Sequence, residues 1–184
     1  MRIIALDPGR VASFAKLDRS TPHLVELGTL SQIGSGRLLR PCPMHLAELL
    51  DDVDVAIVEE VGARPMQGVS SVFTFGLCMG TILGAIGAAK KSLVTVSPTQ
   101  WKKSSRINVK ETSEAKDAAR SFARELWPQH EKLLRVKGNH GLAEAALMAR
   151  WYFHAGPGRF VDPLDSTSSE TWLDEPKRMK TAAA

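Results

Sequence analysis

The segment IVEEVGARPMQGVSSVFTFG, residues 57–76, passes from a buried strand into a loop rich in glycine and proline. The strand begins upstream, because the run from Val53 to Val58 is apolar apart from Asp54. Such a run is typical of a central strand that is covered on both faces. Two carboxylates, Glu59 and Glu60, follow directly at its end. Since side chains alternate along a strand, only one of them faces a given side of the sheet.

The segments around this strand predict a mixed α/β sheet. Arg2 to Leu6 is a short apolar strand that ends at Asp7 in the turn sequence DPGR. Two further strands, 11–17 and 24–30, complete an antiparallel meander. Helices are predicted at 45–50, from Ser70 or Ser71 to about residue 90, at 112–127 and at 141–154, with a strand at 93–96 that Ser97-Pro98 ends. We therefore expect a five-stranded mixed sheet with helices on both faces.

Length and composition indicate one ordinary domain. The chain has 184 residues and a mass of 20.0 kDa, and 43% of its residues are hydrophobic. We expect a folded domain over residues 1–155 and a polar, largely disordered tail over 156–184. Cys42 and Cys78 lack metal-ligand spacing, and no signal peptide is visible, so we expect free thiols in a reducing, cytoplasmic compartment. Residues 77–89 are too short and glycine-rich for a membrane span and predict a buried helix.

Three carboxylates stand in apolar surroundings: Asp7 and Glu59 at strand ends, and Glu144 within LAEAALMARWYF. Burying a lone carboxylate is costly, and several together repel one another, so a divalent cation would stabilise the group. Oxygen ligands favour Mg²⁺ or Mn²⁺ over zinc. The alternatives are an Asx-turn role for Asp7, solvent exposure of Glu59 or Glu60, and an ion pair between Glu144 and Arg150.

His140 lies four residues before Glu144, which places both on one face of a helix. It is a candidate metal ligand, water-binding residue or proton relay. The alternative is an ordinary surface histidine at a helix N-terminus.

The distribution of charge along the chain is more informative than the small net charge. The net charge is +4, but residues 90–137 carry an excess of seven positive charges. This stretch predicts a surface that contacts DNA phosphates, with a solvated helical face as the alternative. The candidate DNA-binding residues are Trp101, Lys102, Lys103, Arg106, Lys110, Lys116 and Arg120, and we place 101–103 on a loop. Phe73 and Phe75 either wedge against an unstacked base or pack in the core.

Four stretches carry a resemblance to a known family. ALDPGR, IVEEVGARPMQGVSSVFTFG, VTVSPTQWKK and NHGLAEAALMARW resemble the RuvC-type Holliday junction resolvases, above all the compact versions found in phages and prophages. The resemblance covers roughly residues 1–153. The most specific matches are Gly-Val-Ser-Ser-x-Phe-x-Phe-Gly and Pro-x-x-Trp-Lys-Lys.

The resemblance implies a ribonuclease H-like fold, a homodimer in a bacterial or phage-infected cell, and a nuclease that hydrolyses branched DNA to 5′-phosphate and 3′-hydroxyl ends. It implies Mg²⁺, with Mn²⁺ as a substitute, bound by Asp7, Glu59 and Glu144. It also implies that residues 71–90 help to build the dimer and that four-way junctions are the substrate.

One position departs from the family pattern. Relatives commonly carry a further acid where this chain reads Asn139-His140-Gly141. We expect His140 to be the fourth catalytic and metal-binding residue, with Asn139 as the alternative. The departure keeps a second hypothesis open, namely a weakly active or inactive protein that binds DNA junctions. An ATPase of the sugar-kinase or chaperone type is disfavoured because the chain lacks a second lobe.

Overall fold

A five-stranded mixed sheet forms the centre of the computed structural model, which describes residues 1–60, 62, 66–107 and 112–154. The strand order is β3-β2-β1-β6-β7. The strands are β1 (Arg2–Asp7), β2 (Ser13–Asp18), β3 (Val25–Thr29), β6 (Val55–Glu59) and β7 (Ser92–Val96). Strands β1 to β3 pair antiparallel, whereas β6 and β7 run parallel to β1. The predicted fold class is confirmed, and so is the meander.

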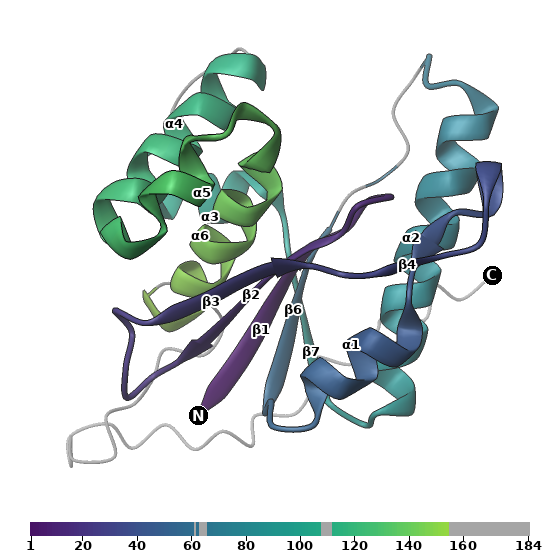
Figure 1. Ribbon diagram of the computed structural model, residues 1–184, viewed down its shortest axis with the longest axis horizontal. Coiled ribbons are helices and arrows are strands. Elements are labelled where there is room, and N and C mark those ends of the chain that lie inside the picture. The colour runs from purple at the N-terminus through teal and green to yellow at the C-terminus, as the bar shows by residue number, and fades with distance from the viewer. Residues whose placement is uncertain (61, 63–65, 108–111, 155–184) are drawn as a thin grey trace, which may run out of the picture.

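Helices cover both faces of the sheet. The helices α3 to α6 lie on one face and α1 and α2 on the other (Figure 1). They are α1 (Pro43–Leu50), α2 (Val69–Ala88), α3 (Pro98–Ser104), α4 (Thr112–Leu126), α5 (Glu131–Arg135) and α6 (His140–His154). Short pieces connect them, namely β4 (Gln32–Ile33), η1 (Gly36–Leu38), β5 (Arg40–Pro41), η2 (Pro128–His130) and η3 (Lys137–Asn139).

Alternation along the strands divides the core in two. In β1, Ile3 and Ala5 face the α6 side, and Ile4 and Leu6 face the α1 and α2 side. In β6, Val55 and Ile57 face α6 in the same way. Continuing this period of two places the last residue of each strand on the α6 face.

The prediction that residues 101–103 lie on a loop was wrong, because they belong to α3. Pro98 is the first residue of α3, where its missing N–H costs nothing. Ser97 caps this helix: its hydroxyl accepts a hydrogen bond from the backbone N–H of Gln100. In return, the backbone N–H of Ser97 donates to the side-chain oxygen of Gln100. The dipeptide that we interpreted as the end of a strand is therefore also the start of a helix.

Helix α2 also departs from the predictions. Its N-cap is Gly68 rather than Ser70 or Ser71. Only four of its residues are buried, namely Thr74, Cys78, Ile82 and Ile86, so the opposite face of this apolar helix is open. At 20 residues it is long and apolar enough to cross a membrane, contrary to our expectation for this segment. Core helices meet the same criterion, and α2 packs on the sheet.

The predicted boundary between a domain and a tail, at residues 155 and 156, lies outside the described residues. Both cysteines are buried free thiols, as expected.

Candidate active site

Asp7 and Glu59 end adjacent parallel strands. Leu6 lies opposite Val58 in the β1–β6 register, so the next residue of each strand is one of the two acids. Both side chains belong to the set that faces α6. Glu60 falls on the other side of the strand, and its backbone N–H donates to the carbonyl oxygen of Val96. The alternation thus selects Glu59 for the site.

Helix α6 brings the third carboxylate to the same place. Every residue from Gly141 to Ala149 is buried, including Glu144, whose exposed fraction is 9%. The helix approaches Asp7 closely at Gly141, where an added Cβ would lie 2.7 Å from Asp7 Oδ2 and 2.7 Å from Ser13 Oγ. Ser13 pairs with Asp7 across β1 and β2. The sequence analysis missed Gly141 and Ser13, although a glycine inside an apolar helix is a signal of close packing.

The three carboxylates repel one another. Burial raises the pKa of Asp7 well above its ordinary value, and the charges of Glu144 and Glu59 raise it further. Burial, followed by the charge of Glu59, raises the pKa of Glu144 to about 7. These shifts reflect negative charges held close together in a poorly solvated place. They are typical of functional sites, where a cation or a proton is needed to balance the charge.

The chemistry of this donor set fits a hard divalent cation, because all three side chains offer carboxylate oxygens. The side chains as they stand are not yet in ligand positions. Within residues 1–60, 62, 66–107 and 112–154, no three His, Cys, Asp or Glu side chains form a metal-binding cluster. Some of these oxygens would have to move toward the others for an ion to bind, and the metal-ligand assignments stay predictions.

Trp101 contacts the site through Glu59. Its indole Nε1–H donates to Glu59 Oε1 at 2.8 Å, and its side chain is 0% exposed. We weighed base stacking against core packing for Trp101, and its buried ring favours packing, because it offers no exposed face on which a base could stack. Lys102, the next residue, places its Nζ 5.2 Å from the Trp101 ring centroid.

His140 lies at the first turn of α6, in cationic surroundings. Burial lowers its pKa, and so do the charges of Lys116 and Arg120. It lines a small hollow of about 270 Å³ together with Ser113, Lys116, Asp117, Lys137 and Gly138. The Asn139 side chain donates to the carbonyl oxygen of Leu133 and so ties η3 to α5. The role of either residue at a metal remains a prediction.

The basic stretch divides between several places. Lys102 and Lys116 both lower the pKa values of Asp7 and Glu144, so they flank the acids. Lys103 and Arg106 are exposed at the end of α3. The guanidinium of Arg120 bonds to Asp117 and to the carbonyl oxygen of Arg135, which indicates a structural role. Lys110 lies outside the described residues.

The two phenylalanines lie in the first turns of α2. Phe73 is 56% exposed, whereas Phe75 is partly buried. Exposure of such a large apolar ring leaves the wedge hypothesis open for Phe73. For Phe75 the packing alternative also stands.

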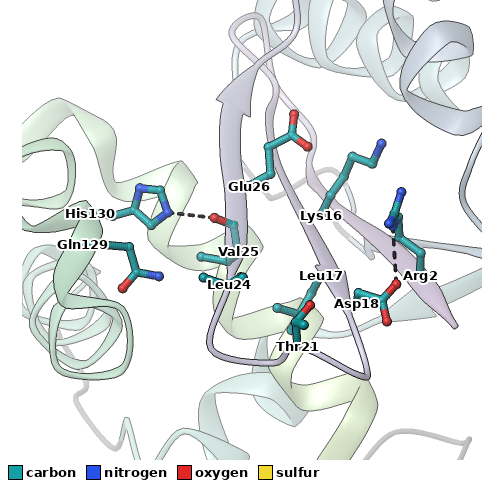
Figure 2. Close-up of a pocket in the computed structure, with 10 residues that line it drawn as sticks. All are labelled: Arg2, Lys16, Leu17, Asp18, Thr21, Leu24, Val25, Glu26, Gln129 and His130. Carbon is teal, nitrogen blue, oxygen red and sulfur yellow. Dashed lines mark hydrogen bonds and ion pairs between the residues drawn. The ribbon is translucent and has the colours of Figure 1, made fainter.

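A larger hollow, of about 470 Å³, lies at the opposite end of the strands, and Figure 2 shows the residues that line it. Arg2, in its lining, begins β1 whereas Asp7 ends it, which separates them by roughly 16 Å of strand. Three of its polar groups already have partners: Lys16 pairs with Asp52, Arg2 with Asp18, and His130 Nε2 with the Val25 carbonyl oxygen. The three carboxylates at the other end of the strands are therefore the stronger candidate for chemistry.

The fold is that of the RuvC and ribonuclease H-like class. Two solved structures of RuvC from Thermus thermophilus match it with a TM-score of 0.53 over 83% of this chain. One, described as a complex with Holliday junction substrate, is 17% identical and is covered over 94% of its length. The other is 16% identical and is covered over 95%. No protein-family model matches the sequence, and neither does any curated protein. At this identity, the likeness establishes the fold.

Proposed function

We propose that this chain is a metal-dependent endonuclease that cuts branched DNA, four-way junctions above all, by phosphodiester hydrolysis. The observation that carries the proposal is the convergence of Asp7, Glu59 and Glu144 between two flanking lysines. Acids that are partly or fully buried and repel one another are costly to the fold unless a bound ligand balances their charge. The RuvC-like fold supports the same conclusion, since one matching structure was solved with a Holliday junction substrate.

Asp7, Glu59 and Glu144 would hold Mg²⁺, or Mn²⁺ in its place, with His140 as a fourth candidate ligand. Such an ion, when bound, lowers the pKa of a coordinated water and stabilises charge on the phosphate. The side chains of the protein supply the phosphate contacts and exclude water. Lys102 and Lys116 bind the phosphodiester and offset the negative charge of the acids. The buried α6 face keeps bulk water from the inner side of the carboxylates.

Binding of a four-way junction would also involve exposed groups around the site. Lys103 and Arg106 extend the positive surface beyond Lys102. Phe73 presents its ring from α2 and could stack on a base that the junction leaves unpaired.

A homodimer fits the open face of α2. Gly76, Gly80 and Gly84 recur every four residues, and an added Cβ at each meets nothing within 4 Å. Beside them lies a hollow of about 370 Å³, lined mainly by apolar residues of α2 such as Val72, Met79 and Leu83. A twofold pairing of two α2 helices would cover this surface, and it would present two active sites to a nearly symmetric junction.

Cleavage of a synthetic four-way junction tests the proposal. We expect the chain to cut it in Mg²⁺ and to leave 5′-phosphate ends. Asp7→Asn should abolish cutting while junction binding is retained, because only a carboxylate charge is lost. Full activity of this variant would remove Asp7 from the site.

A second candidate is a junction-binding protein with little or no activity. It is favoured by the cationic surroundings of His140, where relatives commonly carry an acid. It is also favoured because the carboxylates, among the residues that the structure describes, do not form a ready metal-binding cluster. Tight junction binding without cutting in Mg²⁺ or Mn²⁺ would support this alternative.

A further inference from the structure

Trp101 makes an unusual contact for a buried tryptophan. Its ring is fully buried, and its indole N–H donates to a carboxylate oxygen of Glu59 at 2.8 Å. A hydrogen bond to a charged acceptor is stronger than one to a neutral acceptor, and a buried donor without a partner is costly. Both effects hold the two side chains in one mutual arrangement.

The helix that carries Trp101 is itself fixed. The capping box between Ser97 and Gln100 sets the first turn of α3. Trp101 follows directly, and the ring lies in the same core cluster as Trp151 and Leu142 of α6. The indole donor therefore has little freedom to follow a moving carboxylate, whereas the glutamate has three side-chain torsions.

We infer that Trp101 is a positioning residue for Glu59, whose indole N–H fixes the orientation of that carboxylate in the active site. The inference rests on the proposed function, because it assigns Trp101 a role in metal binding and cleavage. Carboxylates that ligate metals are commonly oriented by such outer hydrogen bonds, and loss of the partner typically costs about 10-fold to 100-fold in metal affinity or activity.

The chain contains a matched control. Trp127 is 2% exposed, and its indole N–H donates at 3.2 Å to the carbonyl oxygen of Pro22. It thus shares the burial and the hydrogen bond of Trp101, but its acceptor is a backbone carbonyl and not a site carboxylate. Trp→Phe at either position removes the N–H and part of the ring at a similar cost to packing.

The first experiment titrates Mg²⁺ in the junction-cleavage assay with wild type, W101F and W127F. We expect W101F to require about tenfold more Mg²⁺ for half-maximal cleavage, or to lose about tenfold in rate. W127F should behave as wild type. Equal behaviour of W101F and W127F would overturn the inference.

The second experiment observes the contact without metal or activity. In ¹⁵N-labelled protein, the Trp101 indole proton should move upfield in E59Q, because a neutral amide replaces a charged acceptor. The Trp127 indole proton should stay in place. An unchanged Trp101 signal would overturn the inference. Should W101F fail to fold, this measurement still tests the hydrogen bond between Trp101 and Glu59.

The two claims fail separately. If wild type does not cut any branched DNA, the proposed function fails, whatever the indole signals show. If wild type cuts and E59Q does not, but W101F matches W127F, the function stands and the role of Trp101 falls.

Discussion

Gly141 is the residue on which the approach of α6 to β1 depends. An alanine Cβ there would lie 2.7 Å from oxygen atoms of Asp7 and Ser13. Gly→Ala inside a helix normally stabilises by about 1 kcal/mol, but here the helix or the carboxylate must shift. We predict that Gly141→Ala lowers the free energy of unfolding and reduces junction cleavage at least tenfold.

Gly87→Ala is the matched control for this prediction, because an added Cβ at Gly87 in α2 meets nothing within 4 Å. It should leave cleavage unchanged and stability equal or slightly higher. Urea unfolding and cleavage rates measure both variants. A fully active Gly141→Ala protein would show that α6 does not need this close contact.

Glu144 gives the metal-free protein a pH-dependent stability. Its pKa is about 7 in the fold, against an ordinary value of 4.5, so the folded state holds the proton more tightly. Protonated Glu144 therefore contributes stability that is fully present below about pH 4.5. This contribution is lost as the pH rises through 7 and the carboxylate becomes charged. The shift corresponds to about 3 kcal/mol. We predict that urea unfolding in EDTA shows lower stability at pH 8 than at pH 5, and a smaller difference in Glu144→Gln.

The exposed Glu114 provides the control, since Glu114→Gln removes a glutamate charge from the surface of α4. Its pH dependence should match wild type. If Glu144→Gln shows the wild-type difference between pH 5 and pH 8, the buried carboxylate is not the source.

At the scale of elements, α3 and α4 carry the lysines that flank the acids. If Lys102 and Lys116 contact phosphates, each contact contributes a slope of about 0.9 log units of affinity per log unit of salt on duplex DNA. We predict that Lys102→Gln and Lys116→Gln each weaken junction binding and reduce this slope by about one contact. Fluorescence anisotropy over a range of salt concentrations measures it.

Lys90 is the control, because it follows α2 and precedes β7, at the end of the strands opposite the acids. Lys90→Gln should keep the wild-type slope. A slope that falls equally in all three variants would mean that net charge, and not these two positions, governs binding.

Individual elements show how far the sequence determines the fold. The apolar run of β6 and the acid at its end predicted a central strand and a site carboxylate, because burial on both faces leaves a clear pattern. The helix α3 was missed because Pro98 suits both a strand end and a first helical turn, and the capping box of Ser97 and Gln100 decides between them. Helix α5 was missed because five residues carry too little periodicity.

The candidate site was predictable in part for the same reasons. Asp7, Glu59 and Glu144 stood out as charges in apolar segments. Trp101 did not stand out as a partner of Glu59, because their contact joins residues 42 positions apart and depends on how α3 folds back. The close packing of Gly141 on Ser13 could not be predicted from the sequence, because it depends on how α6 crosses the sheet.

At the scale of the whole molecule, the open face of α2 predicts association. We expect the chain to be a dimer in solution and Gly80→Glu to be monomeric, because a charged side chain on the glycine face would have to be buried. Sedimentation equilibrium measures this. Glu114→Gln, far along the chain on α4, should remain dimeric, and a wild-type monomer at all concentrations would contradict the pairing.

The central claim is that Asp7, Glu59 and Glu144 together form a site for a divalent cation. A crystal grown or soaked with Mn²⁺ and measured for anomalous scattering tests it most directly. We predict a strong anomalous peak bound by carboxylate oxygens of all three residues, at about 2.1 Å as for Mg²⁺ sites. A map without a peak there, with the three carboxylates still apart, would contradict the claim.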